Sequence, residues 1–147
     1  MVDFAHTPDA IEKTLRALQP LAALRGGDMI CVLGCGGDRD KSKRPLMAAA
    51  AEMYAQQIVL TSDNPRSEDP TAILQDMYAG LKKPQSARTV VDRAQAIAEA
   101  VQHARPNDLV LIAGKGHETY QEILGVKYPF SDQSHVQQAI LHRSMYV

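Results

Sequence analysis

Short apolar runs recur along the chain at intervals that leave room for a helix between one run and the next. They cover residues 28–33, 58–61, 88–91 and 108–112. Between them, apolar side chains recur at the spacing of one face of a helix. Because parallel strands need a long crossover, usually a helix, this alternation predicts an α/β fold. We expect one domain with a mostly parallel sheet and helices on both faces.

The first helix is marked by local signals at both ends. Thr7 followed by Pro8 is a favourable N-cap and first helical position, and the pair Gly26-Gly27 closes the segment. Pro20 lies between these signals. Because proline lacks the backbone N–H that a helix interior needs, we expect Pro20 to end or kink this helix.

The C-terminal part departs from the alternation of strands and helices. Residues 120–130 contain the sequence Ile-Leu-Gly-Val, which is typical of a β-hairpin. After it, a last helix is expected from about Asp132 to Leu141. No internal repeat or linker interrupts the chain.

Composition excludes several classes of function. The 147 residues carry a formal net charge of −1, so there is no overall basic field for nucleic acid. No apolar run approaches the roughly 20 residues that span a bilayer, and no secretory signal is apparent. Cys31 and Cys35 lack further clustered ligands, which argues against zinc and for reduced thiols. We therefore expect a cytoplasmic protein with no metal site of its own and no membrane partner.

Charged and glycine-rich loops follow the predicted strands. They are residues 3–6, 34–41, 63–66 and 114–118. The carboxyl ends of parallel strands share one edge of a sheet, so these distant segments should face one crevice. The glycines let the backbone approach a ligand, and Lys115, His117 and Glu118 could supply chemistry. The alternative is a tight strand exit with solvated charges.

Residues 63–66, Asp-Asn-Pro-Arg, favour a ligand with a carboxylate. Arg66 can grip a carboxylate with two parallel hydrogen bonds, while Asn64 can both donate and accept. With Glu118 opposite, the site would suit a zwitterionic amino acid, its carboxylate on Arg66 and its ammonium on Glu118. The alternatives are an ordinary turn with a surface arginine, or a structural pair between Arg66 and Glu118.

The remaining motifs are weaker. The loop 36–41 could bind an anion, or it could be a solvated connection. Gly114-Lys115 is no phosphate-binding P-loop, because Gly116 follows the lysine where serine or threonine is required. His6 near Asp3 is not accompanied by a serine or cysteine nucleophile motif, so contact with a nucleotide or plain packing is favoured over hydrolase chemistry.

Taken in order, the segments 3–9, 34–40, 43–45, 63–66 and 114–118 form a specific set. This set resembles the C-terminal domain of the Mur ligase family over essentially the whole chain. The resemblance implies a Rossmann-like fold. The form Asp-Asn-Pro-Arg is associated with the members that add meso-2,6-diaminopimelate to UDP-N-acetylmuramoyl-L-alanyl-D-glutamate in peptidoglycan synthesis.

The resemblance also implies a division of labour in a longer enzyme. Residues 1–147 would be its last third, and the N-terminal UDP-binding and central ATPase domains would be absent. ATP, with Mg²⁺, would phosphorylate the D-glutamyl carboxylate, and the incoming amine would attack the acyl phosphate. The other domains would hold most of the phosphates, the metal and the UDP-N-acetylmuramoyl dipeptide. We expect no catalytic residue and no turnover in this chain alone.

The family's contacts can be carried over residue by residue. By resemblance, the amino-acid-binding residues are Arg39, Asp63, Asn64, Pro65, Arg66, Gly114 and Glu118. The nucleotide-binding residues are Asp3, Phe4 and His6. Phe4 stands where tyrosine is commoner, which keeps the ring and loses the hydroxyl. Ser131-Asp132-Gln133 replaces the usual Ser-Asp-Arg, which leaves the role of this tail segment open.

Two alternatives to this interpretation remain. One is a stand-alone small-molecule-binding module. The other is the matching domain of a folylpolyglutamate synthase or of another Mur ligase, which would lack the pair of motifs at 63–66 and 114–118.

Overall fold

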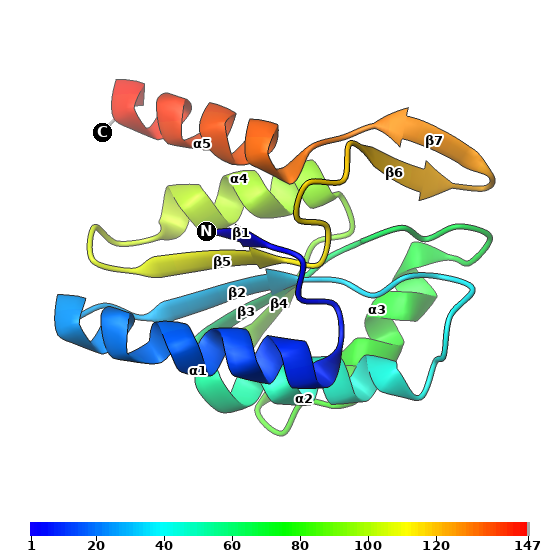
Figure 1. Cartoon of the computed structure of the whole chain (residues 1–147), viewed down its shortest axis with the longest axis horizontal. Helices are drawn as coiled ribbons and strands as arrows, with labels where there is room; N and C mark the ends of the chain where they lie inside the picture. The colour runs from blue at the N-terminus through cyan, green and yellow to red at the C-terminus, as the bar shows by residue number, and fades with distance from the viewer. Residues whose placement is uncertain (147) are drawn as a thin grey trace.

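The computed structural model describes residues 1–146 and is built on a five-stranded parallel sheet. In spatial order the strands are β1 (Val2–Asp3), β5 (Leu109–Ala113), β2 (Met29–Leu33), β3 (Gln57–Leu60) and β4 (Ala87–Thr89). Figure 1 shows that all five point the same way, so the loops that follow them lie at one edge. The predicted parallel sheet is confirmed.

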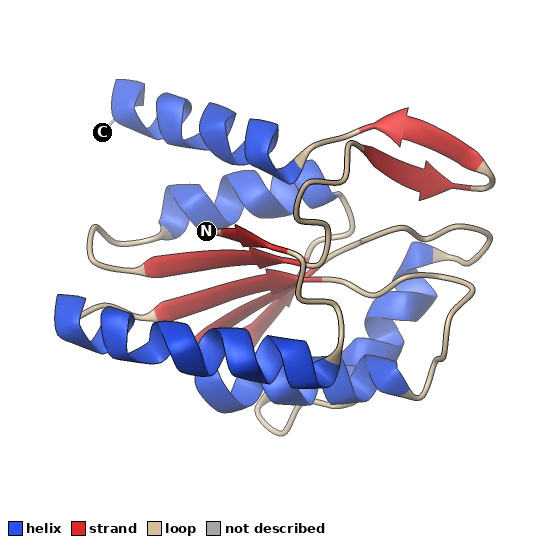
Figure 2. Ribbon diagram, viewed as in Figure 1, coloured by secondary structure: helices blue, strands red, loops and turns tan. Residues whose placement is uncertain are grey.

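Helices cover both faces of the sheet, as predicted (Figure 2). One face carries α1, α2 and α3, and the other carries α4 and α5. The bounds are α1 Pro8–Arg25, α2 Lys43–Tyr54, α3 Pro70–Tyr78, α4 Arg93–His103 and α5 Asp132–Tyr146, with a short 3₁₀ turn at Pro84–Ser86. The predicted hairpin is present as β6 (Tyr120–Ile123) and β7 (Val126–Pro129).

The core follows from the alternation of side chains along the central strands. In β2, Cys31 and Leu33 pack toward α1 and α2, whereas Ile30 and Val32 pack toward α4. All of β2 is buried, because strands lie on both of its sides and helices on both of its faces. This central position explains why an unbroken apolar run marks the strand in the sequence.

Helix starts and stops agree with the local signals, with one exception. Thr7 accepts a hydrogen bond from the Ala10 amide, and Gly26 ends α1 in the left-handed conformation at φ 72°. Pro20, however, does not end α1, which continues to Arg25. Both Pro20 and the residue one turn before it, Arg16, are exposed, so water can satisfy the carbonyl that proline leaves without a partner.

Two further boundaries differ from those expected. β4 covers 87–89 rather than 88–91, and α5 continues to Tyr146 rather than ending near Leu141. The extra length of α5 packs on α4, where Arg143 donates to the Val101 carbonyl. Such long-range packing extends an element without any signal in the local sequence. Within residues 1–146 we find no helix with the length and apolar character needed to cross a membrane.

Candidate functional site

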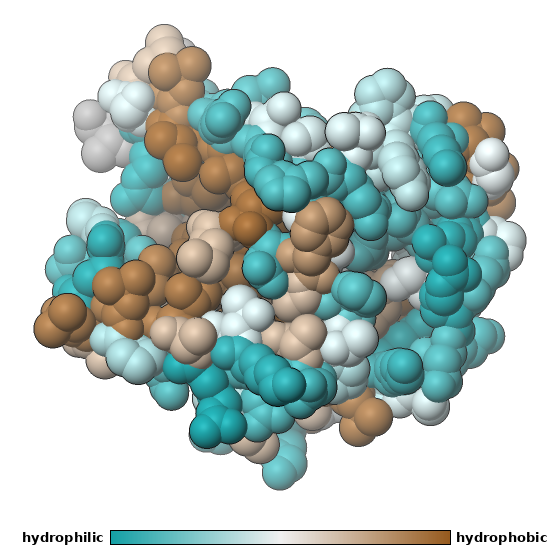
Figure 3. All heavy atoms as spheres, viewed as in Figure 1, coloured by the Kyte–Doolittle hydropathy of each residue, from teal (hydrophilic) through white to brown (hydrophobic). Residues whose placement is uncertain are grey.

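A cavity of about 600 Å³ opens at the carboxyl edge of the sheet. It draws side chains from the loops after β1, β2, β3 and β5, so the predicted convergence of these segments is confirmed. Figure 3 shows hydrophilic residues over this side of the molecule, and apolar ones over α5 and the C-terminal end of α1. The lining residues include Phe4, His6, Arg39, Asp63, Asn64, Arg66, Gly114 and Glu118.

Two residues from the predicted set do not line this cavity. The Asp3 carboxylate accepts hydrogen bonds from the Ala5 amide and, at 3.5 Å, from Thr14. The Pro65 backbone instead packs directly against Gly37, so closely that a Cβ added to Gly37 would collide with the Pro65 carbonyl. Gly37 is therefore the point at which the loops after β2 and β3 pack backbone against backbone.

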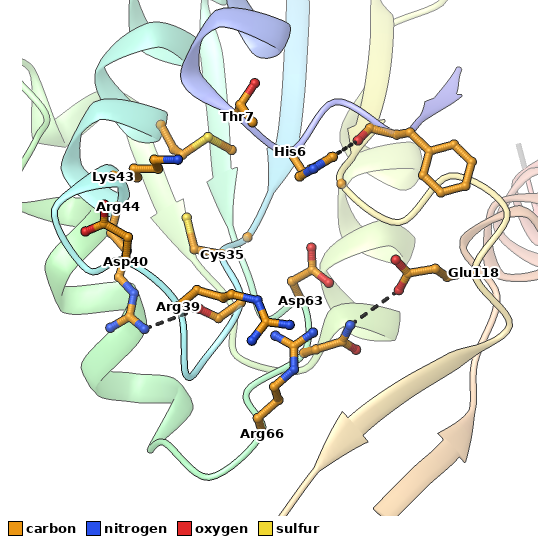
Figure 4. A pocket seen from close by; sticks show the side chains of 16 residues that line it. His6, Thr7, Cys35, Arg39, Asp40, Lys43, Arg44, Asp63, Arg66 and Glu118 are labelled. Atoms are coloured by element: carbon orange, nitrogen blue, oxygen red, sulfur yellow. Dashed lines mark hydrogen bonds between the residues drawn. The ribbon is translucent and has the colours of Figure 1, made fainter. Parts of the chain in front are cut away.

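One side of the cavity, here called the acidic half, consists of Asp63, Asn64 and Glu118. Asp63 and Asn64 are buried at the end of β3, and Glu118 lies in the turn after β5. The Asn64 side-chain amide donates to Glu118 at 3.3 Å (Figure 4), while its oxygen accepts from the Glu122 amide at 2.9 Å. Sequence segments more than fifty residues apart are thus locked together by short polar contacts.

Lys115 was expected to supply chemistry to a ligand, and its position corrects that expectation. Its side chain is fully buried beneath the acidic half. The ammonium contacts Asn64 Oδ1 at 2.7 Å, the Tyr120 carbonyl at 3.0 Å and Asp63 Oδ1 at 3.3 Å. A buried lysine needs such partners, because an isolated ammonium is costly to remove from water.

The other side, here called the basic half, consists of Arg39 and Arg66. Both side chains lie beside Gly36, which belongs to the loop after β2. Figure 4 shows the two guanidinium groups close together near Asp63. A Cβ added to Gly36 would lie 2.7 Å from Arg66 Nη1 and 3.5 Å from Arg39 Cγ, so glycine makes the room for both side chains. Arg66 Nη1 donates to the Gly37 carbonyl, and Arg66 Nε lies 3.7 Å from Glu122 Oε1. Arg39 donates to the neighbouring Asp38 carbonyl.

The backbone of Arg66 is held by the hairpin. Its φ of 52° is uncommon for a residue with a side chain. The Arg66 amide donates to the Glu122 carbonyl at 3.0 Å, and its carbonyl accepts from the Leu124 amide at 2.7 Å. Strain of this kind persists only where the surroundings fix it, and it often marks binding sites. The hairpin is thus part of the site, a role that its sequence does not reveal.

A buried arginine that sequence reasoning missed supports the basic half. Arg44, at the start of α2, donates to Glu68 at 2.7 Å, to Asp76 at 3.0 Å and to the Gly36 carbonyl at 3.2 Å. Hydrogen bonds from Arg44, together with one from the Asp38 amide, lower the pKa of Glu68 to about 2. Residues 43–45 belong to the set of segments that carries the resemblance to the Mur ligase family, but the sequence assigns Arg44 no role.

A second missed pair, Arg93 with Asp132, lies beneath the acidic half. Both side chains are fully buried, and two hydrogen bonds of 2.7 Å join them. Arg93 also donates to the carbonyls of Ser62 and Ala113, the residues just before Asp63 and Gly114. Burial alone would lower the pKa of Arg93, but the hydrogen bonds that Arg93 donates to Asp132 raise it, so the guanidinium stays charged. This contact gives the tail segment 131–133 its role.

Aromatic side chains stand at the rim near β1. Phe4 is 46% exposed, and its ring meets the ring of His117 edge to face at 5.6 Å. His6 is exposed and bonds to the Phe4 carbonyl rather than to Asp3, so the structure brings no dyad together here. His117 bonds to Gln133. An exposed ring at a cavity rim is a surface on which a planar group can stack.

The thiols do not extend this chemistry. Burial raises the pKa of both Cys31 and Cys35 to about 12, so both remain protonated near neutral pH. Within residues 1–146, no group of three His, Cys, Asp or Glu side chains is arranged to hold a metal ion. What the cavity offers a ligand is therefore guanidinium groups facing carboxylates, with an aromatic rim beside them.

Comparison with known proteins gives this geometry a context. A family model, "Mur ligase, glutamate ligase domain", matches residues 1–116. The UDP-N-acetylmuramoyl-L-alanyl-D-glutamate–2,6-diaminopimelate ligase of Ralstonia nicotianae is 57% identical over 145 residues, which cover 99% of this chain and 28% of that protein. A solved structure with the same name has a TM-score of 0.88 at 45% identity, covering 97% of this chain and 29% of the other.

A more distant likeness concerns the fold alone. The folylpolyglutamate synthase of Thermotoga maritima has a TM-score of 0.54 at 16% identity, covering 76% of this chain and 23% of that one. The chain thus spans less than a third of the length of these relatives. Because the family model matches well over half of it, the chain belongs to the Mur ligase family.

Proposed function

We propose that this chain is the amino-acid-binding C-terminal domain of an ATP-dependent ligase that adds meso-2,6-diaminopimelate to UDP-N-acetylmuramoyl-L-alanyl-D-glutamate. The observation that carries the proposal is the pairing of Arg39 and Arg66 with Asp63 and Glu118 around one cavity. Relatives bearing this activity in their names are identical at about half of the matched positions, from 49% to 57% in the sequences compared.

The charges of the cavity suit an amino acid. A zwitterionic head has one carboxylate and one ammonium, which match the basic half and the acidic half in turn. Diaminopimelate differs from lysine by a second carboxylate, and Arg66 offers that group two parallel hydrogen bonds. A site built to pair a polar group rejects an analogue that lacks it, because the site's own groups are then left unpaired.

Phe4 and His6 fit the base and sugar end of ATP. The Phe4 ring is exposed at the rim, where an adenine ring could stack on it, and His6 lies on the same segment. Asp3 fits less directly, because its Oδ2 atom already accepts the Ala5 amide. We assign magnesium and most phosphate contacts to the domains outside this chain, as the resemblance to the family implies.

In this proposal the domain binds and orients a substrate, and its side chains take no part in making or breaking bonds. ATP supplies the phosphoryl group that activates the D-glutamyl carboxylate in the parent enzyme. The residues of this chain hold diaminopimelate by its charged groups, so that its reacting amine meets the activated carboxylate in a fixed orientation. Converting a bimolecular encounter into an oriented one can supply several kcal/mol of the barrier, about 7–11 kcal/mol at most.

The shares of sequence covered support a domain of a longer protein over a stand-alone module. The chain covers 28% of the Ralstonia relative, leaving room for UDP-binding and ATPase domains that hold the nucleotide dipeptide. We expect such an enzyme in the cytoplasm. The alternative of a folylpolyglutamate synthase domain is weaker, because identity to that structure is only 16%.

The central test uses the full-length ligase that contains this domain. Changing Arg66→Ala should raise the KM for diaminopimelate by an amount worth about 2–5 kcal/mol, because a charged bidentate contact is lost. The KM for ATP should change little. Arg66→Lys keeps the positive charge but not the two parallel N–H groups of the guanidinium, so its KM for diaminopimelate should lie between those of the unaltered enzyme and Arg66→Ala. Equal effects on both substrates, or no ADP release that depends on diaminopimelate, would overturn the proposal.

A second measurement concerns the isolated chain. With ATP, magnesium, the nucleotide dipeptide and diaminopimelate supplied together, it should release no ADP above background. Turnover by the isolated chain would contradict its assignment as a binding domain.

A further inference from the structure

The ammonium of Lys115 is the common partner of the three side chains in the acidic half. Besides Asn64 Oδ1 and Asp63 Oδ1, it lies 3.4 Å from Glu118 Oε1. These partners come from the loops after β3 and β5, so one buried cation joins two segments of the site. The fully buried position leaves Lys115 no direct contact with solvent.

The contacts leave one oxygen of each carboxylate free. Asp63 meets Lys115 through Oδ1, and its Oδ2 lies under Gly114, where a Cβ would come within 2.8 Å. Glu118 uses Oε1 for both Lys115 and Asn64. Within residues 1–146, neither Asp63 Oδ2 nor Glu118 Oε2 accepts a hydrogen bond. Both residues line the cavity, so two acceptor oxygens remain for a ligand.

Lys115 also fixes the orientation of Asn64. The Asn64 oxygen accepts from both Lys115 and the Glu122 amide, so its NH₂ group must point toward Glu118. Without the ammonium, the Glu122 amide would be left as a donor to this oxygen, and the shorter of the two contacts would be lost. The Asn64 amide would then be held less firmly in the orientation that points its NH₂ group toward Glu118.

The charges around Lys115 add up to a definite number. Asp63 and Glu118 contribute two negative charges and Lys115 one positive charge, while the nearby Arg93 and Asp132 cancel each other. Lys115 and the acidic half together therefore carry a formal net charge of −1, which one ligand ammonium neutralises.

We propose that Lys115 is a positioning residue that sets the acidic half to accept a single ligand ammonium. It acts through Asp63, Asn64 and Glu118 rather than by touching the ligand. This inference rests on the proposed function, because it concerns the same amino acid site. It adds a residue to which no ligand contact was assigned, and it makes the selectivity depend on a charge under the cavity.

Kinetics of the full-length ligase test the inference. Lys115→Met keeps a long unbranched chain and removes the charge. It should raise the KM for diaminopimelate at least about tenfold, with the KM for ATP within about twofold. Lys115→Arg restores the charge with a different shape and should recover part of the loss. Lys127→Met is the matched control, because Lys127 is exposed and also lies over the Tyr120 ring but contacts none of the three side chains.

A spectroscopic measurement keeps the test decisive if Lys115→Met does not fold. In unaltered full-length ligase labelled with ¹⁵N-lysine, the buried Lys115 ammonium should give a slowly exchanging signal. Adding meso-diaminopimelate should shift this signal, and adding ATP alone should leave it in place. A signal insensitive to diaminopimelate would overturn the inference.

The outcomes separate this inference from the proposed function. A folded Lys115→Met variant with unchanged kinetics, or with both KM values raised equally, would overturn the role of Lys115 alone. If the unaltered enzyme shows no ADP release dependent on diaminopimelate, the proposed function fails and the role of Lys115 fails with it.

Discussion

The two halves of the cavity are built in different ways. In the acidic half, Asp63 and Asn64 are less than 10% exposed, and both contact the buried ammonium of Lys115. The buried Arg93 donates to the carbonyl of Ser62, the residue before Asp63. In the basic half, Arg39 is exposed and donates to the carbonyl of its neighbour Asp38, which is its one hydrogen bond within residues 1–146. The comparison indicates that the acidic half is fixed before a ligand arrives, whereas part of the basic half can adjust to it.

The largest effect is expected beneath the acidic half. Arg93→Met should lower the free energy of unfolding by about 3–5 kcal/mol, because Asp132 would remain as a buried charge without a partner. Urea unfolding of the chain measures this. Arg88→Met removes an arginine that pairs with Glu99 at the surface, so it should cost no more than about 1 kcal/mol. Similar losses for the two variants would contradict the idea of a buried support.

A smaller effect, visible as a pH dependence, is expected beneath the basic half. The folded pKa of Glu68 is about 2, below its ordinary value of 4.5, so its ionised form stabilises the fold above pH 4.5. That contribution is lost as the pH falls from 4.5 toward 2. Glu68→Gln should therefore flatten the curve of stability against pH in this window. Parallel curves for the two proteins would argue against the pair with Arg44.

Gly36→Ala should separate binding from stability. The added methyl would push on Arg66 Nη1, the movable end of a side chain, so the fold should survive. The displaced guanidinium should raise the KM for diaminopimelate on the order of tenfold in the full-length enzyme. Gly37→Ala is the contrast, because its methyl meets the Pro65 backbone and should instead lower stability. An unchanged KM for diaminopimelate in Gly36→Ala would contradict the proposal that Arg66 binds this substrate.

The smallest change in stability is expected at Arg39. Because this side chain is exposed, Arg39→Ala should alter the free energy of unfolding by no more than about 0.5 kcal/mol. Asn64→Ala should cost about 1–3 kcal/mol, since it leaves the Glu122 amide without an acceptor and removes the shortest contact of the Lys115 ammonium. Comparing the two by thermal unfolding measures the difference in rigidity directly. Equal costs would remove the distinction between the halves.

Most of the fold follows from patterns that are local in the sequence. Unbroken apolar runs marked β2, β3 and β5 because these strands are covered on both faces, and the capping residue Thr7 marked the start of α1. Pro20 was expected to end or kink α1, and the helix does not end there, because the cost of a missing hydrogen bond depends on whether water reaches the carbonyl. The end of α5 could not be predicted either, since it depends on packing against α4.

The residues that line the cavity could be predicted from the sequence, whereas the buried residues that support them could not. Residues that face the cavity, such as Asn64 and Glu118, lie in loops whose composition is unusual for a turn. Their supports, Arg44, Arg93 and the buried ammonium of Lys115, have the same residue types as solvated charges. Only burial distinguishes a support from a surface charge, and burial is a property of the folded chain. The roles of the cavity residues in binding remain predictions.

The hairpin has a consequence for how amino acid preference in such a domain can be changed. Leu124 and Gly125 form its turn, with φ of 50° and 78°, and the register of that turn decides which groups meet the Arg66 backbone. Lengthening the hairpin by one residue should change which of its backbone groups bond to the Arg66 backbone, and so turn the Arg66 guanidinium, without altering the central sheet. Directed evolution toward other diamino acids could therefore work on a solvent-facing turn instead of the protein interior.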